Sequence, residues 1–331
     1  MILDIKKIKE IMCGAVDVKE ENGHYVVYRF TDEEMAVEGN PNVHYSSGAR
    51  LTFKTDATSV KIRFYARNLA VRSYFSLDVY RDGILSGSIS NCSDVIDCFA
   101  EKQYNLGDFS GEFPLGDGEK TVDIVIPHSV KCEIEYIELE NAKTVTAVKR
   151  PKVLLAYGDS ITQGYDALHP GHTYASRLAD ALDAELYNKA LGGAPFCPYL
   201  VKVENGVNTP DYITAAYGTN DWSHLDYETI KINCEGFLKE LHGKYPDVPT
   251  FILTPIWRAD MNAEKPSGTF AEIAALIENA CKPYKNMTVV HGLTLVPEDT
   301  SLFGDARLHP NDEGFKHYAE NLAKIIKIIK E

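Results

Sequence analysis

The sequence predicts two domains of different fold class: an all-β antiparallel sandwich over residues 1–147 and an α/β domain with a parallel sheet over residues 148–331. The length of 331 residues suits about two domains. Short β-branched runs separated by turn residues fill the first part. From about residue 150, short apolar runs instead alternate with stretches of helical periodicity.

The first 147 residues contain a series of short strand-like segments. Turn signals such as Arg81-Asp82-Gly83 separate several of them. Strands at this spacing are typical of a sandwich, which we expect to be jelly-roll-like. The expected strands cover residues 25–30, 50–54, 60–65, 74–80, 122–127 and 132–139.

The second part alternates strands with helices. Residues 153–157 form a near-continuous apolar run, as expected for a strand that is covered on both faces. The β-α order predicts a three-layer architecture, in which a five-stranded parallel sheet lies between two layers of helices. The other expected strands are 186–191, 212–217, 250–253 and 287–291, and the expected helices are 172–184, 227–242, 270–280 and 312–330.

Composition excludes several classes of function. Thirty-four Lys and Arg against 48 Asp and Glu give a formal charge of −14, which argues against nucleic acid or an anionic membrane as the main partner. A membrane-spanning helix needs about 20 apolar residues, and the longest apolar runs here are far shorter. No secretory leader is visible, so we expect a cytoplasmic protein, with secretion as the alternative if a leader has been trimmed from the sequence. The seven scattered cysteines lack zinc-ligand spacing, and we expect no metal and no cofactor.

Residues 154–164, LLAYGDSITQG, are the most informative segment. A strand is expected to end at Tyr157, Gly158 permits a tight turn, and Ser160 stands where a helix should begin. Sites in open α/β sheets form at the carboxyl ends of strands, and the free N–H groups of a helix start can bind an anion. The pattern therefore favours a nucleophilic Ser160 whose own N–H stabilises an oxyanion. The alternative is that Ser160 only caps the helix.

This segment resembles the first sequence block of the GDSL-type (SGNH) hydrolases, a superfamily of esterases with a flavodoxin-like fold. Residues 188–193, NKALGG, resemble the block that supplies a glycine to the oxyanion hole. Gly193 matches that glycine best, and Gly192 stays possible.

Two more blocks follow in the family's order. Residues 218–221, GTND, resemble the block that makes Asn220 the side-chain oxyanion donor. His309 with Pro310 and Gly314 resembles the last block, which makes His309 the general base. The resemblance covers about residues 150–331 and implies that Ser160, Gly193 and Asn220 form the oxyanion hole.

The chain departs from the family pattern at the acid of the triad. The family usually places an Asp three residues before the His, where this chain has Ala306; Asp305 lies four before His309. A one-residue bulge could still bring this carboxylate to the imidazole, and we predict Asp305 as the third catalytic residue. Two alternatives stay open, a Ser–His dyad oriented by a backbone carbonyl, or Asp305 as an ordinary turn residue.

Several polar and aromatic side chains follow the expected strands. Asp159 and Asp221 are expected to hold turns, and His169 with His172 is expected to form a rim loop rather than a metal site. The predicted substrate-binding residues are Trp222, Trp257 and Arg258, and packing under loops is an equally good interpretation of Trp222.

The order of the two domains is similar to that of carbohydrate esterase family 2, whose members remove acetyl groups from sugars and include some without the acid of the triad. The resemblance implies a serine esterase that acts on short acyl esters of small molecules or oligosaccharides. One alternative is a lipid or thioester acylhydrolase with the same machinery. Another is a non-catalytic carbohydrate-binding protein, with Tyr65, Tyr74 or Tyr80 stacking on sugar. The sequence does not indicate an oligomeric state.

Overall fold

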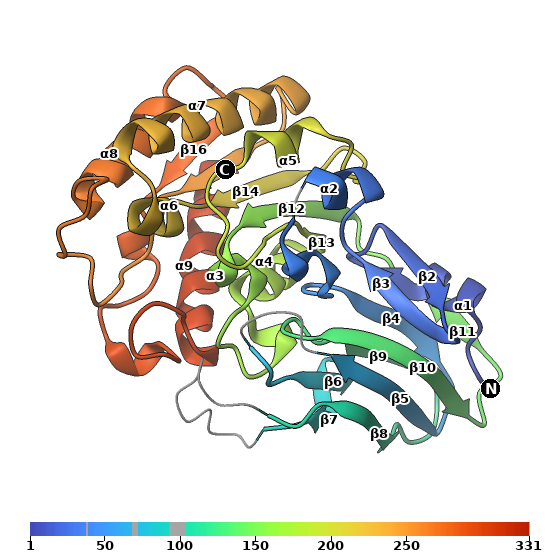
Figure 1. The fold of residues 1–331 in the computed structure, drawn as a ribbon. Coiled ribbons are helices and arrows are strands. Elements are labelled where there is room, and N and C mark those ends of the chain that lie inside the picture. Colours follow the sequence, from blue (N-terminus) through green and yellow to red (C-terminus); the bar gives the residue numbers. More distant parts are fainter. Residues whose placement is uncertain (38, 68–71, 93–103, 331) are drawn as a thin grey trace.

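The pairing of strands changes direction part-way along the chain (Figure 1). The computed structural model describes residues 1–37, 39–67, 72–92 and 104–330. Strands up to β11 (Val145–Ala147) pair antiparallel, and those from β12 (Lys152–Gly158) onward pair parallel. The two parts therefore have the two fold classes that the sequence predicts.

Two antiparallel sheets form the first part. Their strands, in chain order, are β1 (Met12–Cys13), β2 (Asp17–Glu21), β3 (His24–Tyr28), β4 (Arg50–Thr55), β5 (Ser59–Arg67), β6 (Ser76–Arg81), β7 (Ile84–Ser90), β8 (Gly107–Pro114), β9 (Lys120–Val125) and β10 (Lys131–Glu140). One sheet has the order β1-β4-β9-β6-β7 with β11 beside β4, and the other has the order β2-β3-β10-β5-β8.

A single apolar core fills the space between the two sheets. Phe53 of β4 and Val122 of β9 pack in the same cluster as Ile62 and Phe64 of β5, which belong to the opposite sheet. Alternate residues along β4 and β5 are buried, because successive side chains of a strand point to opposite faces. The first part is therefore a sandwich.

The strands that the sequence failed to predict lie at sheet edges. β1, β7, β2 and β8 are the end strands of their sheets, and β11 is a three-residue strand off the main path. Edge strands such as β8 are largely exposed, so they lack the apolar alternation on which prediction depends. Within the described residues of the first part, the sequence also missed two short helices, α1 (Ile5–Ile11) and α2 (Asp32–Val37).

A five-stranded parallel sheet forms the centre of the second part. Its order is β13 (Ala184–Asn188), β12, β14 (Tyr212–Ala216), β15 (Thr250–Leu253) and β16 (Met287–Val290), which is the flavodoxin-like order 2-1-3-4-5. The helices are α3 (Ser160–Gln163), α4 (Tyr174–Leu182), α5 (Pro198–Lys202), α6 (Thr219–His224), α7 (Tyr227–Lys244), α8 (Phe270–Cys281) and α9 (Asp312–Lys330).

Helices cover both faces of this sheet. Leu154 and Ala156 of β12 pack in the cluster that contains residues of α4 and α9, whereas Leu155 and Tyr157 pack in the cluster that contains residues of α7 and α8. Burial on both faces explains the continuous apolar run of β12. The predicted second strand, 186–191, is placed too late in the chain. β13 runs over Ala184–Asn188, and the residues after Asn188 leave the sheet as a loop.

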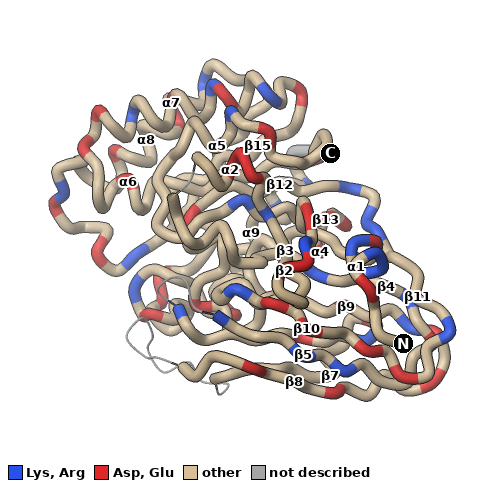
Figure 2. The backbone as a smooth tube through the Cα atoms, turned by 45° about the vertical axis from the view of Figure 1, so that its right-hand side comes forward, with Lys and Arg blue, Asp and Glu red and all other residues tan. Residues whose placement is uncertain are grey.

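Charges of both signs are interspersed over the two domains (Figure 2). The excess of acidic residues is therefore spread along the chain rather than gathered in one tail. Among the helices of the described part, none is both long enough and apolar enough to span a membrane.

Candidate active site

Ser160 lies at the point where the central strand β12 passes into helix α3. It is the first residue of α3, and Asp159 caps the helix by accepting the N–H of Ile161 at 2.9 Å. Gly158 is required at this turn, because a Cβ there would lie 2.1 Å from Thr162 Oγ1 and 2.9 Å from the Ala216 carbonyl oxygen. The N–H of Ser160 has no acceptor within the helix, since the first residues of a helix lack one.

His309, which is 149 residues further along the chain, lies beside Ser160. Ser160 Oγ lies 2.8 Å from His309 Nε2, and His309 Nδ1 lies 2.7 Å from Asp305 Oδ2. If Nδ1–H donates to the carboxylate, Nε2 carries the lone pair that accepts the Ser160 hydroxyl proton. The structure thus brings together the three side chains that the sequence predicts as nucleophile, base and acid.

The extra residue before His309 is accommodated by a tight turn. Ala306 has φ of +51°, in the left-handed region, and the Gly304 N–H donates to the His309 carbonyl at 2.8 Å. Asp305 Oδ1 accepts the backbone N–H groups of the next residues, at 2.7 Å from Leu308 and 3.0 Å from both Arg307 and His309. This bulge leaves Oδ2 free to face the imidazole.

The same turn keeps Asp305 ionised. Burial would raise its pKa, but the hydrogen bond and positive charge of His309, with the N–H groups of Leu308 and His309, outweigh burial and hold the pKa of Asp305 well below its usual range. A carboxylate in this state favours an imidazolium at His309 when the base takes a proton.

The three donors expected to form the oxyanion hole lie on three different elements. Besides the N–H of Ser160, they are the backbone N–H of Gly193, for which no acceptor is present among the described residues, and the side-chain amide of Asn220 in α6. Asn220 Nδ2 donates to the Ala194 carbonyl at 3.3 Å, which holds the amide beside the Gly193 loop. Gly192 is a poorer candidate, because its N–H already donates to Gln163 Oε1 at 2.7 Å.

Asp221 connects the start of α6 with the loop that contains Gly193. Its carboxylate accepts the N–H of Gly218 at 3.0 Å and that of Phe196 at 3.1 Å, so it ties the start of α6 to the loop that contains Gly193. Burial raises the pKa of Asp221 to about 6, although these N–H groups oppose the shift. As the sequence predicts, its contacts are those of a turn-holding residue.

Two of the three predicted substrate-binding residues are buried inside the fold, which corrects that prediction. Trp222 is 0% exposed, and its Nε1–H donates to the Gly268 carbonyl at 3.0 Å. Arg258 is 2% exposed and is held by Asp260, Thr219 and Ser223. The Arg258 guanidinium lies 4.8 Å from the ring of Trp222, which is a residue of α6, so Arg258 packs against this helix. Trp257 is half-buried against Phe303 and stays a candidate.

The first domain contributes directly to the oxyanion loop, which sequence reasoning missed. Arg29 is 1% exposed and donates to the carbonyl oxygens of Asn188 and Ala190. Lys189 and Glu34 form an ion pair at 2.6 Å in which both side chains are 0% exposed. Charged residues are seldom buried, so a reading of the sequence places Arg29, Lys189 and Glu34 on the surface by default. Nothing in their sequence context indicates that they are buried.

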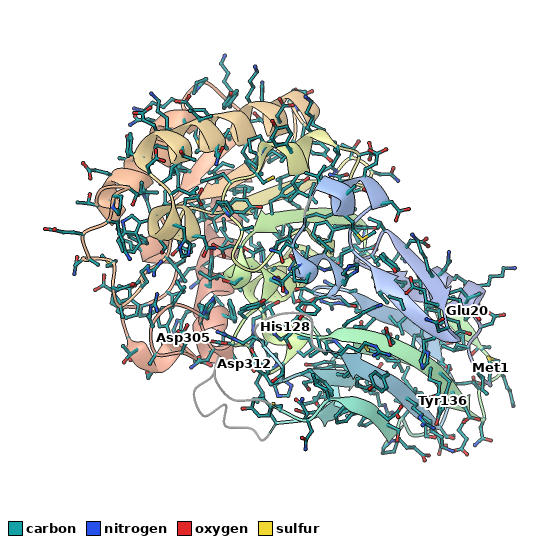
Figure 3. The ribbon with its side chains drawn as sticks, viewed as in Figure 1. Met1, Glu20, His128, Tyr136, Asp305 and Asp312 are labelled. Atoms are coloured by element: carbon teal, nitrogen blue, oxygen red, sulfur yellow. The ribbon has the colours of Figure 1, made fainter. Side chains whose placement is uncertain are left out.

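The two histidines of the expected rim loop are engaged with carboxylates. His169 Nδ1 lies 3.0 Å from Asp78 Oδ2, and His172 Nδ1 lies 2.6 Å from Asp312 Oδ2. Ligand atoms of His169, His172 and Asp312 lie within 4.8 Å of one another, so these residues could hold a divalent cation. Figure 3 labels Asp312 and Asp305 on the C-terminal segment and His128 near the junction of the domains.

Comparison with known proteins assigns the second domain to a family. Residues 156–317 match the model of the GDSL-like lipase/acylhydrolase family. The second domain belongs to this family. Membership makes the GDSL-like domain a carboxylic ester hydrolase, which agrees with the arrangement of Ser160, His309 and Asp305. No curated protein sequence matches this chain.

Solved structures share the two-domain fold over nearly the whole chain. The GDSL-like chain is similar to the salicylyl-acyltransferase SsfX3 from a tetracycline biosynthetic pathway, with 19% identity, a TM-score of 0.78, and coverage of 96% of this chain and 94% of that one. A family two carbohydrate esterase from Cellvibrio japonicus has 16% identity and a TM-score of 0.66, with coverage of 98% and 96%. The acetyl xylan esterase Est2A from Butyrivibrio proteoclasticus has 15% identity and a TM-score of 0.64, with coverage of 99% and 98%. At these identities the likeness shows the fold.

Proposed function

We propose that this protein is a serine esterase that removes short acyl groups, above all O-acetyl groups, from sugars or oligosaccharides. The observation that carries the proposal is the chain of contacts from Ser160 Oγ to His309 Nε2 at 2.8 Å and from His309 Nδ1 to Asp305 at 2.7 Å. A hydroxyl, a base and an oriented carboxylate in this order activate serine as a nucleophile.

In the first half of the reaction, Ser160 Oγ attacks the ester carbonyl carbon while its proton passes to His309 Nε2. The negative charge that develops on the carbonyl oxygen is stabilised by the N–H groups of Ser160 and Gly193 and by the Asn220 amide. The tetrahedral intermediate then collapses, and His309 returns the proton to the departing sugar hydroxyl. Ser160 is left acylated.

In the second half, water replaces the sugar. His309 takes a proton from the water as its oxygen attacks the acyl carbon, and the same N–H groups stabilise the second oxyanion. Collapse of this intermediate breaks the bond to Ser160 Oγ, which recovers its proton from His309, and the free carboxylic acid leaves. Asp305 stays ionised throughout and stabilises the imidazolium that forms in each half.

The sugar substrate is supported by the comparisons rather than by a feature of the site. Two of the similar structures, a family two carbohydrate esterase and an acetyl xylan esterase, share both domains of this chain and not only the GDSL-like domain. The acyltransferase SsfX3 has the same two-domain fold, so transfer of the acyl group to an added alcohol is a second outcome to be measured.

The proposal is tested by measuring acetate release from a panel of acetylated mono- and oligosaccharides. We expect release by the wild type and by Ser110→Ala, which removes an exposed hydroxyl on β8, and none by Ser160→Ala. Release from no member of the panel would overturn the sugar ester assignment. Formation of an acetylated product from an added alcohol, in preference to acetate, would instead indicate acyl transfer.

The acyl group is tested separately with p-nitrophenyl esters of increasing chain length. We expect the acetate to be cleaved with the highest kcat/KM. A clear preference for long chains would favour the alternative of a lipid or thioester acylhydrolase.

The non-catalytic alternative needs the sandwich tyrosines as a sugar-binding surface. Tyr74 does not serve, because it is 1% exposed and its hydroxyl accepts the Asp166 N–H at 2.6 Å. Tyr65 lies under Arg67, whose guanidinium is 4.4 Å from its ring. Tyr80 is partly buried, with its hydroxyl 3.5 Å from Asp78. These contacts favour the esterase.

A further inference from the structure

A buried ion pair between the two domains lies directly behind the candidate base. Arg72 of the sandwich donates to Asp166 of the GDSL-like domain, with Nε 2.8 Å from Oδ1 and Nη2 3.3 Å from Oδ2. The side chain of Arg72 is 6% exposed and that of Asp166 is 0% exposed. A fork of two hydrogen bonds fixes the position of both groups.

Both members of this pair face the imidazole of His309. Asp166 Oδ2 lies 3.8 Å from His309 Nδ1, and Arg72 Nη2 lies 3.5 Å from the same atom. In the tautomer whose Nδ1–H donates to Asp305 at 2.7 Å, Nδ1 has no lone pair for Arg72, and the contact is then one of charge rather than a hydrogen bond. The base therefore has a second carboxylate and a guanidinium beside it.

Asp166 is held where it is from several directions. Its φ is +69°, in the left-handed region, and its N–H donates to the buried hydroxyl of Tyr74. Gly304 gives it room, because a Cβ there would lie 2.6 Å from Asp166 Cβ. A residue in a sparsely populated conformation, locked by contacts from both domains, suggests a positional requirement.

We propose that Arg72 and Asp166 are positioning residues that balance the charge around His309, so that Asp305 alone receives its Nδ1 proton and Nε2 stays aligned with Ser160. This inference rests on the proposed function. Arg72 draws Asp166 into the ion pair and keeps this second carboxylate from competing for Nδ1. The sandwich thereby becomes part of the catalytic machinery rather than an appended module.

Among the described residues, titratable and charged groups from both domains face His309. They are Asp305 on its own turn, Asp166 after α3, Arg72 from the sandwich and Asp159 beside the nucleophile, and the ring of Tyr165 lies 5.7 Å from the imidazole. Burial raises the pKa of Asp166, and the charges of His309 and Arg72 oppose that shift. Removing the positive charge of Arg72 therefore favours proton binding by the whole group, whichever member takes the proton.

A purely structural role for the ion pair makes a different prediction. An ion pair that only joins the domains would lower stability when broken, and it would leave the pH dependence of the reaction unchanged. The pH profile therefore separates the two roles.

The test is the pH profile of kcat/KM on p-nitrophenyl acetate for Arg72→Met, Asp166→Asn and the double variant. For Arg72→Met we expect the acid limb to move about one unit to higher pH, with kcat about tenfold lower and KM unchanged. For Asp166→Asn we expect the limb to move to lower pH, because a negative charge has been removed. In the double variant the two charge changes cancel, and the limb returns to within about 0.3 units of the wild type.

Arg67→Met is the matched control, since it breaks an exposed pair with Glu133 in the same domain and should leave the profile unchanged. If Arg72→Met does not fold, Asp166→Asn still tests the sign, because it keeps the shape of the side chain. Unchanged acid limbs in the folded variants would overturn the inference.

An NMR pH titration of the His309 imidazole in the same variants keeps this failure distinct from a failure of the proposed function. Shifts of the titration in the expected directions without any esterase activity would reject the proposed function and the catalytic meaning of the pair together. Activity that depends on Ser160, with neither the titration nor the acid limb displaced, would reject only the inference.

Discussion

Two carboxylates flank the Ser160–His309 pair, and their surroundings drive their pKa values in opposite directions. Asp159, on the nucleophile side, is 2% exposed and accepts the N–H of Ile161; burial raises its pKa to about 7, although this N–H and His309 oppose the shift. On the histidine side, Asp305 accepts three backbone N–H groups and faces the imidazole, which holds its pKa low despite burial. Residue type alone does not set the pKa of either carboxylate; the balance between burial and the hydrogen-bond and charge partners of each group does, and for Asp305 the largest opposing partner is His309.

The largest effect should come from the histidine side. Asp305→Asn keeps the side-chain oxygen that accepts the backbone N–H groups of the turn, but it cannot stabilise the imidazolium. We expect kcat on p-nitrophenyl acetate to fall about 10³-fold with little change in KM. Asp299→Asn, at a similar capping turn before Ser301, is the control and should keep full activity. A loss of less than about threefold in Asp305→Asn would remove this carboxylate from the mechanism and favour the dyad.

The next effect concerns the oxyanion donors on the nucleophile side. Asn220→Ala removes one donor to the developing charge, which costs about 3 kcal/mol and lowers kcat by about 10²-fold. Asn321→Ala breaks a similar amide-to-carbonyl bond in α9, far along the chain, and serves as the control. Equal activity of the two variants in steady-state kinetics would contradict the assigned role of Asn220.

The pH dependence of the free energy of unfolding should distinguish Asp159 from Asp305. Folded Asp159, with a pKa of about 7, holds a proton that the unfolded chain, near 3.8, has lost. Its contribution to stability is therefore present below about pH 4 and is lost as pH rises through 7, whereas Asp305 contributes no change in this window. Urea unfolding of the wild type and Asp159→Asn at pH 5 and pH 8 should show the variant gaining about 2 kcal/mol relative to the wild type at the higher pH.

Asp226→Asn is the control for that measurement, because Asp226 is an exposed cap whose pKa is lowered by its hydrogen bonds to Thr229. The stability of Asp226→Asn relative to the wild type should be the same at pH 5 and pH 8, because this variant keeps Asp159. If Asp159→Asn behaves in the same way, Asp159 is ionised in the folded protein and the contrast between the two sides is wrong.

The smallest effect tests the bulge. Ala306 has φ of +51°, where glycine is favoured, so Ala306→Gly should raise the free energy of unfolding by about 0.5 kcal/mol and leave kcat unchanged. The control is Ala275→Gly, at an exposed position inside α8, which should lose about 1 kcal/mol. Destabilisation of similar size in both variants would show that the turn does not need its left-handed residue.

The difference between Asp159, beside the nucleophile, and Asp305, beside the histidine, was only partly predictable from the sequence. Ser160 and His309 were found because the strand–turn–helix pattern and the ordered motifs are local, and local patterns survive in a single sequence. The bulge at Asp305 could be suggested, since one residue of extra spacing is visible, but the N–H groups that fill Oδ1 follow only from the folded turn.

The contributions of the sandwich were not predictable. Arg29, Glu34 and Arg72 lie among ordinary β-strand and loop residues, and only tertiary packing turns them into buried partners of Ala190, Lys189 and Asp166. The same limit explains Arg258, which was expected to face substrate because it follows a strand end, and Trp222, for which packing under loops was an equally good expectation. A position after a strand end does not specify whether a side chain turns outward or back into the core.

The most direct test of the central claim is intact-protein mass spectrometry after exposure to a fluorophosphonate, which reacts with activated serine hydroxyls. We expect a single adduct on Ser160 in the wild type, a much slower reaction in His309→Ala, and none in Ser160→Ala. A fully active esterase that forms no adduct, or one whose adduct maps to a different serine, would contradict the account.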